Sequence, residues 1–398
     1  MTGEDSCDNV HWRDDGKVTG IGGFGGNTML RLTRIHVEGF LSFREVDLDV
    51  RQVNVLIGGN GAGKSNVIKL LKMLKALAER RLGDFVREHH GANCILHYGA
   101  KVTPRMRVAL NFAADNGWVE YHFELAANGN DALAFADESM TWCRSGEDGP
   151  QSRSLGSGHM ETHLADEETA GVPGAKLVRD FLLDSCAYHF RDISRFAHDK
   201  PILMQDAWEL RGDGSNLPNF LLTLEISHPD YYQRIVDTIR QVAPHFRRFS
   251  LGSGGTDPSS NQLRWYEEKS DYLFNQHQLP DGLLRFMALA TLLLEPPDSP
   301  SIHLPPLIGV DEPELGLHPF ALNVLVSLIR KASTRCQFVL ATQSVSLVDR
   351  FDPEEIVRVE REGGASVLHR LDPEDLAEWL EEYSLGELWE KNVIGGRP

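Results

Sequence analysis

The sequence predicts an α/β protein in which a mixed sheet is flanked by helices, with an inserted helical lobe and an antiparallel β segment. Short apolar runs of strand length at 53–57, 307–310 and 337–341 predict the core of the sheet. The first two runs are followed by helical patterns, which is typical of β–α units. The β segment is indicated by apolar–polar alternation over 105–135, with a turn at Asp115–Gly117.

Composition sets limits on the class of protein. The chain has 398 residues, 41% hydrophobic and 25% charged, which fits a globular protein of one large or two ordinary domains. No apolar run reaches the roughly 18 residues that span a bilayer, and the acidic, polar N-terminus is unlike a secretory signal. The five cysteines show no paired spacing, which argues against zinc or disulfides. We therefore expect a cytoplasmic protein with no membrane partner.

The order of patterns along the chain predicts the domain organisation. Residues 1–29 are rich in glycine and poor in apolar residues, as in a disordered tail. Residues 30–143 are expected to form the N-terminal part of the core, including a helix over 64–81. Residues 144–174 are rich in Gly, Ser and acidic side chains, and we expect a flexible loop there.

The second half of the chain is expected to form an inserted lobe, followed by further strands and helices of the core. Residues 175–274 predict an inserted helical and β lobe, whose two helices are split at His228–Pro229. Residues 275–350 return to the core with its second and third apolar strands, and 351–398 form a C-terminal β–α segment. A terminal helix is expected to pack one apolar face on the core, with a partner-binding surface as the alternative; that face carries Leu376, Trp379, Leu380 and Tyr383.

The clearest motif is GGNGAGKSN, which follows an apolar strand and opens a helix. This spacing and context are those of the Walker A phosphate loop, in which glycines let backbone N–H groups surround a phosphate. Lys64 is expected to reach the β- and γ-phosphates of ATP, and the Ser65 hydroxyl to ligate Mg²⁺. The predicted ATP-binding residues are Gly58, Gly59, Asn60, Gly61, Ala62, Gly63, Lys64, Ser65 and Asn66.

Two later strands end in polar side chains that complete such a site. The strand over 307–310 runs into Asp311 and Glu312, and the carboxyl end of a parallel strand lies beside a phosphate loop. We expect Asp311 to hold Mg²⁺ and Glu312 to polarise the attacking water. Gln343 ends the third strand and is expected to lie opposite the γ-phosphate.

The blocks GGNGAGKSN, DEPELGLHP and ATQSVSLVD, in this order, resemble ABC-type ATPases of the RecF, SMC and overcoming-lysogenization-defect kind. The chain also resembles a standalone bacterial "predicted ATPase" family labelled AAA, with which it shares RGDGSNLPNFL, LPDGLLRF and WLEEYSLGELWEKNVIGGRP. The resemblance extends over about residues 30–398. It implies a P-loop ABC-type core that hydrolyses ATP with Mg²⁺.

The resemblance also implies a signature loop that meets the ATP of a second subunit, and it places this loop at LPDG, before a long apolar stretch. The residues implied to act in trans are Pro280, Asp281, Gly282 and Arg285. Pro280 stands where the family has serine, which removes a hydroxyl and an N–H, and Gln343 stands where many relatives carry histidine. The departure at Gln343 and that at His318, which stands where the family often has aspartate, imply slow turnover. The alternative is a plain turn leading into a buried helix.

A further element implied by the resemblance is a Q-loop. The segment after the strand at 186–190, with Arg191 and Asp192, is its expected position, although it contains no glutamine.

Several functions fit an ATPase of this kind. We expect an ATP-dependent homodimer that acts as a switch for a separate effector, such as a Toprim or HNH nuclease, in anti-phage defence or DNA maintenance. The chain after Ser344 is too short for a fused catalytic domain.

The alternative is a RecF-like DNA-binding repair ATPase, although a net charge of −18 gives DNA binding no support. A basic stripe would then come from Lys69, Lys72, Lys75, Arg80 and Arg81. A transporter ATPase subunit is the least favoured, because the insertion is long.

Overall fold

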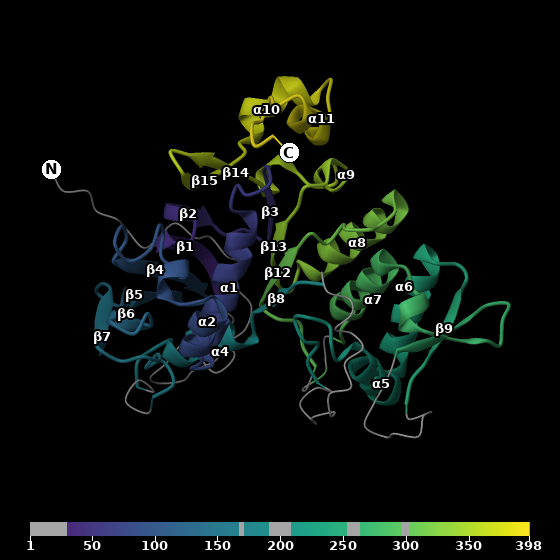
Figure 1. The fold of residues 1–398 in the computed structure, drawn as a ribbon, viewed down its shortest axis with the longest axis horizontal. Coiled ribbons are helices and arrows are strands. Elements are labelled where there is room, and N and C mark those ends of the chain that lie inside the picture. Colours follow the sequence, from purple (N-terminus) through teal and green to yellow (C-terminus); the bar gives the residue numbers. More distant parts are fainter. Residues whose placement is uncertain are drawn as a thin grey trace. The chain divides into compact units, whose positions relative to one another are not determined.

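The computed structural model describes residues 30–166, 171–190, 208–252, 263–296, 299 and 302–397 (Figure 1). The predicted tail, 1–29, lies outside these residues. The chain divides into two compact units. The first contains the chain up to Val50 together with Ala76–Leu183, and the second contains Arg51–Lys75 and Asp184 onward. Among the described residues, no helix has the length and apolar character needed to cross a membrane.

The first unit is built on a six-stranded antiparallel sheet with the order β2-β1-β4-β5-β6-β7. Its strands are β1 (Arg31–Phe40), β2 (Phe43–Asp49), β4 (Arg105–Ala114), β5 (Gly117–Ala127), β6 (Leu133–Arg144) and β7 (Gln151–Gly156). Helices α2 (Leu82–Glu88), α3 (Ala92–Ile95) and α4 (Ala175–Asp184) accompany it. Every second side chain of β4 from Met106 to Phe112 is fully buried, as the alternation predicted.

The structure differs from two sequence predictions in this unit. Residues 144–174, expected as a flexible loop, contain strand β7, which pairs with β6, and the buried side chains of Thr162 and Leu164. The predicted continuous segment 30–143 is divided, because Arg51–Lys75 belongs to the second unit. The polar composition that suggested a loop instead supplies hydrogen-bonding groups to an edge strand and to the segment after it.

The second unit contains a six-stranded mixed sheet with the order β15-β14-β3-β13-β12-β8. Neighbours from β14 to β8 are parallel, and β15 is antiparallel to β14. The strands are β3 (Val53–Ile57), β8 (Cys186–Tyr188), β12 (Leu307–Asp311), β13 (Gln337–Ala341), β14 (Ile356–Glu362) and β15 (Ala365–Arg370). The three apolar runs of the sequence are therefore adjacent central strands, which confirms the predicted mixed sheet.

Helices cover both faces of this sheet. Helix α1 (Lys64–Ala78) packs on one face at Gly309, where a Cβ atom would lie 2.9 Å from Leu71 Cδ1. In Figure 1, α6, α7 and α8 lie together on the other side of β12. Helix α7 (Asp281–Leu293) is buried at every residue from Gly282 to Leu293, as expected of a helix between two neighbours. Helix α8 (Pro319–Ala332) connects β12 to β13, and α9 (Val345–Val348) follows β13.

The inserted lobe is smaller than predicted. It contains α5 (Leu217–Ser227), α6 (Pro229–Val242) and the antiparallel sheet β11-β10-β9. The strands are β9 (Phe246–Ser250), β10 (Arg264–Glu267) and β11 (Leu273–Asn275), and they are followed by the 3-10 turn η4 (Gln276–Gln278). The split at His228–Pro229 is confirmed, and β10 and β11 form an antiparallel hairpin. Of the predicted lobe, 175–274, α4 belongs instead to the first unit and β8 to the main sheet.

The C-terminal segment has the predicted β–α order. After η5 (Pro353–Glu355), β14 and β15 lead to α10 (Pro373–Leu380) and α11 (Leu385–Glu390). The predicted apolar face only partly packs on the core: Leu376 is buried, whereas the Trp379 side chain is exposed.

Asn54 is a polar side chain at the centre of the main sheet. It is fully buried in β3, where its Nδ2 donates to the carbonyls of Arg51 (2.8 Å) and Phe338 (2.9 Å). Its Oδ1 accepts from Arg51 N (2.9 Å) and from the Arg370 guanidinium (2.6 Å). The side chain thus joins β3, β13 and β15 through four hydrogen bonds.

Replacing Asn54 with alanine should lower the free energy of unfolding by about 2–4 kcal/mol, because buried donors and acceptors lose their partners. Urea titration followed by circular dichroism measures this change. Asn130→Ala, at an exposed turn residue, is the control and should change stability by less than about 0.5 kcal/mol. Equal stability of the two variants would contradict the role assigned to Asn54.

Candidate functional site

The phosphate loop connects β3 to α1. Gly58 and Gly63 have φ values of +153° and +121°, which side-chain-bearing residues rarely adopt. A Cβ atom on Gly58 would also lie 2.2 Å from the carbonyl oxygen of Val359 in β14. Only glycine therefore fits at Gly58, and the loop turns so that α1 begins at Lys64 with its N-terminal N–H groups facing the loop.

Lys64 is buried and folds back over this loop. Its Nζ donates to the carbonyl oxygens of Gly58 (2.5 Å) and Gly59 (3.0 Å). Burial lowers the pKa of the Lys64 ammonium, and the carboxylates of Asp311, Glu312 and Glu314 act in the opposite direction. The ammonium is thus held at the centre of the loop, on the side of the acidic residues.

Ser65 and Asp311 meet at the carboxyl edge of the sheet. Ser65 Oγ donates to Asp311 Oδ1 at 3.2 Å, although the two residues are 246 positions apart. His189 directly follows β8, and its Nδ1 lies 3.5 Å from Asp311 Oδ2. A hydroxyl, a carboxylate and an imidazole therefore converge, and the first two are the oxygen ligands that Mg²⁺ prefers.

Glu312 occupies a strained backbone position next to Asp311. Its φ is +52°, in the left-handed region that non-glycine residues seldom adopt and that is often found at functional sites. The conformation is held by a hydrogen bond from Glu312 N to Ala341 O (2.8 Å). The Gln343 side-chain amide donates to Glu312 Oε1 at 3.2 Å. Its expected position opposite a γ-phosphate remains a prediction.

Glu314 accepts hydrogen bonds from the residues that follow β13. The sequence analysis did not identify it as a site residue. Its Oε1 accepts from Thr342 Oγ1 (2.6 Å) and from the backbone N–H of Gln343 (3.1 Å). Burial raises the pKa of the Glu314 carboxyl, and the hydrogen bond from Thr342 partly offsets this effect. The third carboxylate in the run DEPE is the signal that could have identified it.

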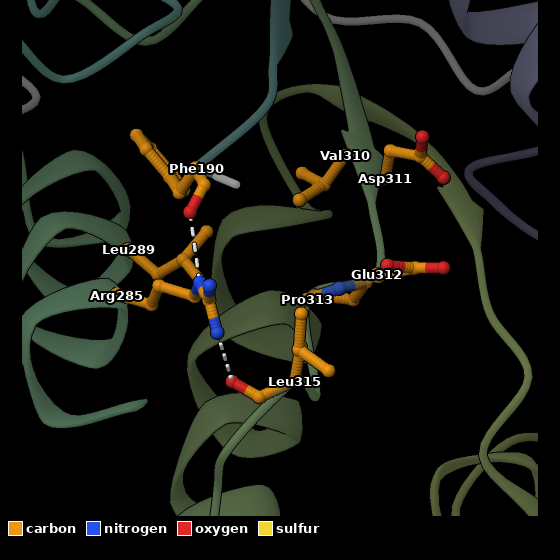
Figure 2. A pocket seen from close by; sticks show the side chains of 8 residues that line it. All are labelled: Phe190, Arg285, Leu289, Val310, Asp311, Glu312, Pro313 and Leu315. Carbon is orange, nitrogen blue, oxygen red and sulfur yellow. Dashed lines mark hydrogen bonds between the residues drawn. The ribbon is translucent and has the colours of Figure 1, made fainter. Parts of the chain in front are cut away.

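Arg285 makes contacts within its own chain. Its Nε donates to Phe190 O (2.8 Å) and one terminal nitrogen donates to Leu315 O (2.9 Å), in a small pocket beside β12. Figure 2 shows the carboxylates of Asp311 and Glu312 directed away from this guanidinium. The prediction that Arg285 reaches a nucleotide phosphate of another subunit is not supported by this arrangement, because the side chain is buried and hydrogen-bonded to two carbonyls.

The LPDG segment forms the start of α7. Pro280 is the N-cap residue and is exposed together with Asp281, whereas Gly282 is buried. A Cβ atom on Gly282 would lie 1.9 Å from Gly316 O, so this glycine permits close contact with the loop that follows Glu312. The turn before a buried helix is therefore present, and contact of Pro280, Asp281 and Gly282 with another subunit remains a prediction.

The structure brings together five of the residues predicted from the sequence, namely Lys64, Ser65, Asp311, Glu312 and Gln343. His189 and Glu314 are additional. The expected Q-loop residues Arg191 and Asp192 lie outside the described residues.

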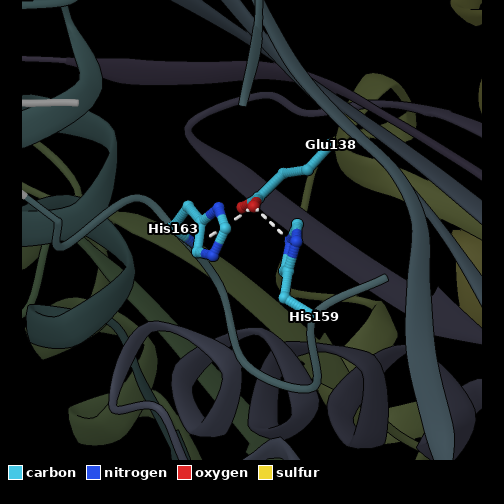
Figure 3. A group of neighbouring side chains, drawn as sticks. All are labelled: Glu138, His159 and His163. Atoms are coloured by element: carbon cyan, nitrogen blue, oxygen red, sulfur yellow. Dashed lines mark hydrogen bonds and ion pairs between the residues drawn. The ribbon is translucent and has the colours of Figure 1, made fainter. Parts of the chain in front are cut away.

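A second cluster, formed by Glu138, His159 and His163, belongs to the first unit (Figure 3). The fully buried Glu138 carboxylate accepts from Tyr121 Oη (2.6 Å), His159 Nε2 (2.9 Å) and His163 N (3.0 Å), and also from Thr162 Oγ1. These donors occupy the roughly four acceptor positions of a carboxylate. The two imidazole rings stack with centroids 3.8 Å apart. The cluster therefore fastens residues 159–163 to the sheet.

The chain matches, over residues 53–169 and 173–349, the family described as "AAA domain, putative AbiEii toxin, Type IV TA system". No curated protein matches it in sequence. Among solved structures it is similar to an SMC head bound to the C-terminal winged-helix domain of ScpA, with a TM-score of 0.57 and 16% identity over 87% of this chain and 99% of that chain. It is also similar to an SMC head with an extended coiled coil from Pyrococcus furiosus, bound to the C-terminal domain of ScpA. There the TM-score is 0.55, with 16% identity over 89% of this chain and 99% of that chain.

The fold and the phosphate-loop site define a P-loop ATPase core of the ABC type, of which SMC heads are examples. The family match covers more than half of the chain, and the protein belongs to this AAA-domain family. The fold class and the family resemblance expected from the sequence are thus confirmed.

Glu138→Gln should lower the free energy of unfolding of the first unit by about 2–4 kcal/mol, because an amide cannot accept all four hydrogen bonds. Urea titration followed by tryptophan fluorescence measures the change. Glu88→Gln, at an exposed residue of α2, is the matched control and should stay within about 0.5 kcal/mol of wild type. A loss as small as that of the control would show that the cluster is not fastened through Glu138.

The raised pKa of Glu314 predicts a dependence of stability on pH. Because its folded-state pKa lies above the ordinary value of 4.5, ionisation of Glu314 disfavours the folded state. Its contribution to stability is therefore lost as pH rises from the unfolded-state pKa through the folded-state pKa. Glu314→Gln keeps an acceptor for Thr342 and has no charge. Urea titrations from pH 4.5 to 8.5 should show the variant gaining stability relative to wild type as pH rises, and a flat difference would contradict this.

Proposed function

We propose that this protein is an ATP-binding and hydrolysing ABC-type ATPase, related in mechanism to RecF and SMC proteins, that works as an ATP-dependent dimeric switch. One observation carries the proposal: the helix-opening Ser65 and the strand-ending Asp311 lie 3.2 Å apart beside Lys64. This pairing of a phosphate loop with an acidic strand end is the arrangement by which P-loop proteins hold a nucleotide and its cation.

The residues present fit ATP and Mg²⁺. The glycine positions and the helix N-terminus offer backbone N–H groups to phosphate oxygens, and Ser65 and Asp311 offer oxygen atoms to a hard cation. When bound, ATP supplies the hydrolysable phosphoanhydride and Mg²⁺ withdraws charge from it. His189, beside Asp311, would orient that carboxylate.

Four side chains of the protein have separate roles in the proposed hydrolysis. When ATP binds, Lys64 replaces its hydrogen bonds to the Gly58 and Gly59 carbonyls with hydrogen bonds to phosphate oxygens. The buried ammonium then has a negatively charged acceptor in place of neutral carbonyls. Glu312 accepts a proton from the attacking water, and Gln343 holds that carboxylate in position. Glu314 fixes Thr342 and Gln343 through its own hydrogen bonds. The neutral Gln343 amide offers less charge stabilisation than a protonated histidine, so turnover is slow.

The surface next to the site favours a second copy of the chain as the partner in the dimer. Leu315 and Phe320, in the stretch that follows Glu312, have exposed fractions of 42% and 51%. Pro280 and Asp281 are exposed at the start of α7, whose Gly282 contacts this same stretch. Exposed apolar side chains beside a binding site are a feature of a surface that is covered on assembly.

The output of the switch would pass to a separate effector, for which a nuclease of the Toprim or HNH type in anti-phage defence or DNA maintenance is the proposed example. The family's description as an AbiEii-type toxin of a toxin–antitoxin system supports a defence setting. The exposed Trp379 of α10 offers a contact point for such a partner.

Direct binding of DNA receives less support. Three cations of the predicted basic stripe are paired with carboxylates: Lys75 with Glu209, Arg80 with Asp166 and Arg81 with Asp84. The net charge of −18 also opposes association with phosphate backbones.

Glu312→Gln should trap ATP by removing the proton acceptor while leaving the binding groups intact. Light scattering of this variant with and without Mg-ATP should show an ATP-dependent doubling of mass, because two bound nucleotides close the dimer. ATP turnover, measured by phosphate release, should fall about 100-fold or more.

The control is the double variant Lys64→Ala/Glu312→Gln, which should remain at the mass of the nucleotide-free protein. An unchanged monomer with bound ATP would refute the dimeric switch and leave the nucleotide site intact. Absence of ATP binding in wild type would refute the proposed function itself.

A further inference from the structure

The segment Ile394–Arg397 lies against the first two residues of the phosphate loop. The carbonyl oxygen of Arg397 is 2.9 Å from the position that a Cβ atom would take on Gly59. A Cβ atom on Gly396 would lie 3.7 Å from Gly58 Cα. Gly58 also faces the backbone of Val359 in β14. The start of the loop therefore contacts two backbone segments of the second unit, and in Figure 1 the C-terminal end lies just below α10 and α11.

This segment is anchored by specific hydrogen bonds. The fully buried Trp389 of α11 donates from Nε1 to Gly396 O at 2.6 Å. Gly396 N donates to Glu360 Oε1 at 2.6 Å, and Arg358 donates to Ile394 O at 3.0 Å. Because Arg358 and Glu360 also pair with each other at 3.1 Å, the anchor is a connected network on β14.

Two glycines are required for the path of the segment. Gly395 and Gly396 have φ values of +70° and +65°. A Cβ atom on Gly396 would lie 2.8 Å from Arg358 Cγ, and one on Gly395 would lie 2.8 Å from Glu360 Oε1. Both the left-handed backbone and the nearness of Arg358 and Glu360 therefore disfavour a side chain at these two positions.

The segment supports the loop without filling the space beside it. An open hollow of about 500 Å³ lies beside the loop and the segment, and residues of the loop, of the end of β14 and of the segment line it, including Gly59, Asn60, Arg361 and Arg397. The segment therefore leaves this space unfilled. The contact instead restricts the backbone of Gly58 and Gly59, whose carbonyls hold Lys64.

We propose that Trp389 and Gly396 are positioning residues for nucleotide binding, because they hold Ile394–Arg397 against the phosphate loop and keep Gly58 and Gly59 in the phosphate-binding conformation. This inference rests on the proposed function and adds to it a support that touches neither the nucleotide nor Glu312. Loss of the support raises the dissociation constant and the KM for ATP and leaves kcat unchanged, since the hydrolytic groups do not contact the segment.

Trp389→Phe tests this inference, because it keeps an aromatic ring in the core and removes the N–H that binds Gly396 O. The dissociation constant for a fluorescent ATP analogue carrying a ribose-linked reporter should rise about fivefold, the effect of one lost hydrogen bond of about 1 kcal/mol. KM for ATP should rise by the same factor with kcat unchanged. Trp208→Phe, at an exposed tryptophan, is the matched control and should bind as wild type does.

Gly396→Ala provides a second test that does not alter the core. Its new methyl group pushes the segment away from Arg358, and analogue binding should weaken by at least fivefold. Gly363→Ala is its control, because Gly363 also has positive φ (+55°) but its Cβ would meet no atom within 4 Å. Gly363→Ala should therefore bind as wild type does.

The outcomes separate the inference from the function on which it rests. If Trp389→Phe or Gly396→Ala has a lower melting temperature but the same dissociation constant as wild type, measured well below that temperature, the segment is only structural and the inference is overturned. A fall in kcat with unchanged KM would also overturn it. Failure of wild type to bind the analogue would overturn the proposed function, and the inference with it.

Discussion

The parallel register of β3, β13 and β12 is the constraint on which the site depends. Leu56 is level with Ala341, and Ala341 is level with Asp311. The phosphate loop, the Thr342–Gln343 end and the Asp311–Glu312 pair therefore leave the sheet at the same edge, although they are far apart in the sequence. A slip of one residue in any of these strands would reverse the faces of its side chains and separate Ser65 from Asp311.

Much of this arrangement could be predicted from the sequence, because each part has a local signal. The apolar strand before Gly58, the glycine spacing and the acidic pair after Val310 all depend on neighbours in the chain. His189 has no such signal: it follows a strand of three residues and reaches Asp311 only because β8 pairs with β12. Contacts that depend on sheet pairing alone are not visible in a single sequence. The same reason explains why β7 was expected to be loop.

Arg285 shows a second reason why a contact cannot be predicted from the sequence. A cation at the head of an apolar helix, next to a candidate signature loop, suggests a ligand for phosphate. In the structure, the guanidinium is buried and bonds to two carbonyls that belong to distant segments. Burial of a charge is tolerated when its donors are satisfied, and the sequence gives no indication that Phe190 O and Leu315 O are within reach. The guanidinium consequently fixes the end of β8 relative to the loop after Glu312.

The left-handed backbone at Glu312 has a consequence for how this protein responds to selection for stability. A non-glycine residue in that region costs about 1–3 kcal/mol, and the proposed proton acceptor bears that cost. Glycine or asparagine would adopt the same conformation more easily. Screening random variants for heat resistance alone would therefore enrich chains that have exchanged this carboxylate for Gly or Asn, and such chains would be more stable but would lack the proposed proton acceptor. Thermostability and the proposed turnover of ATP are in conflict at this position.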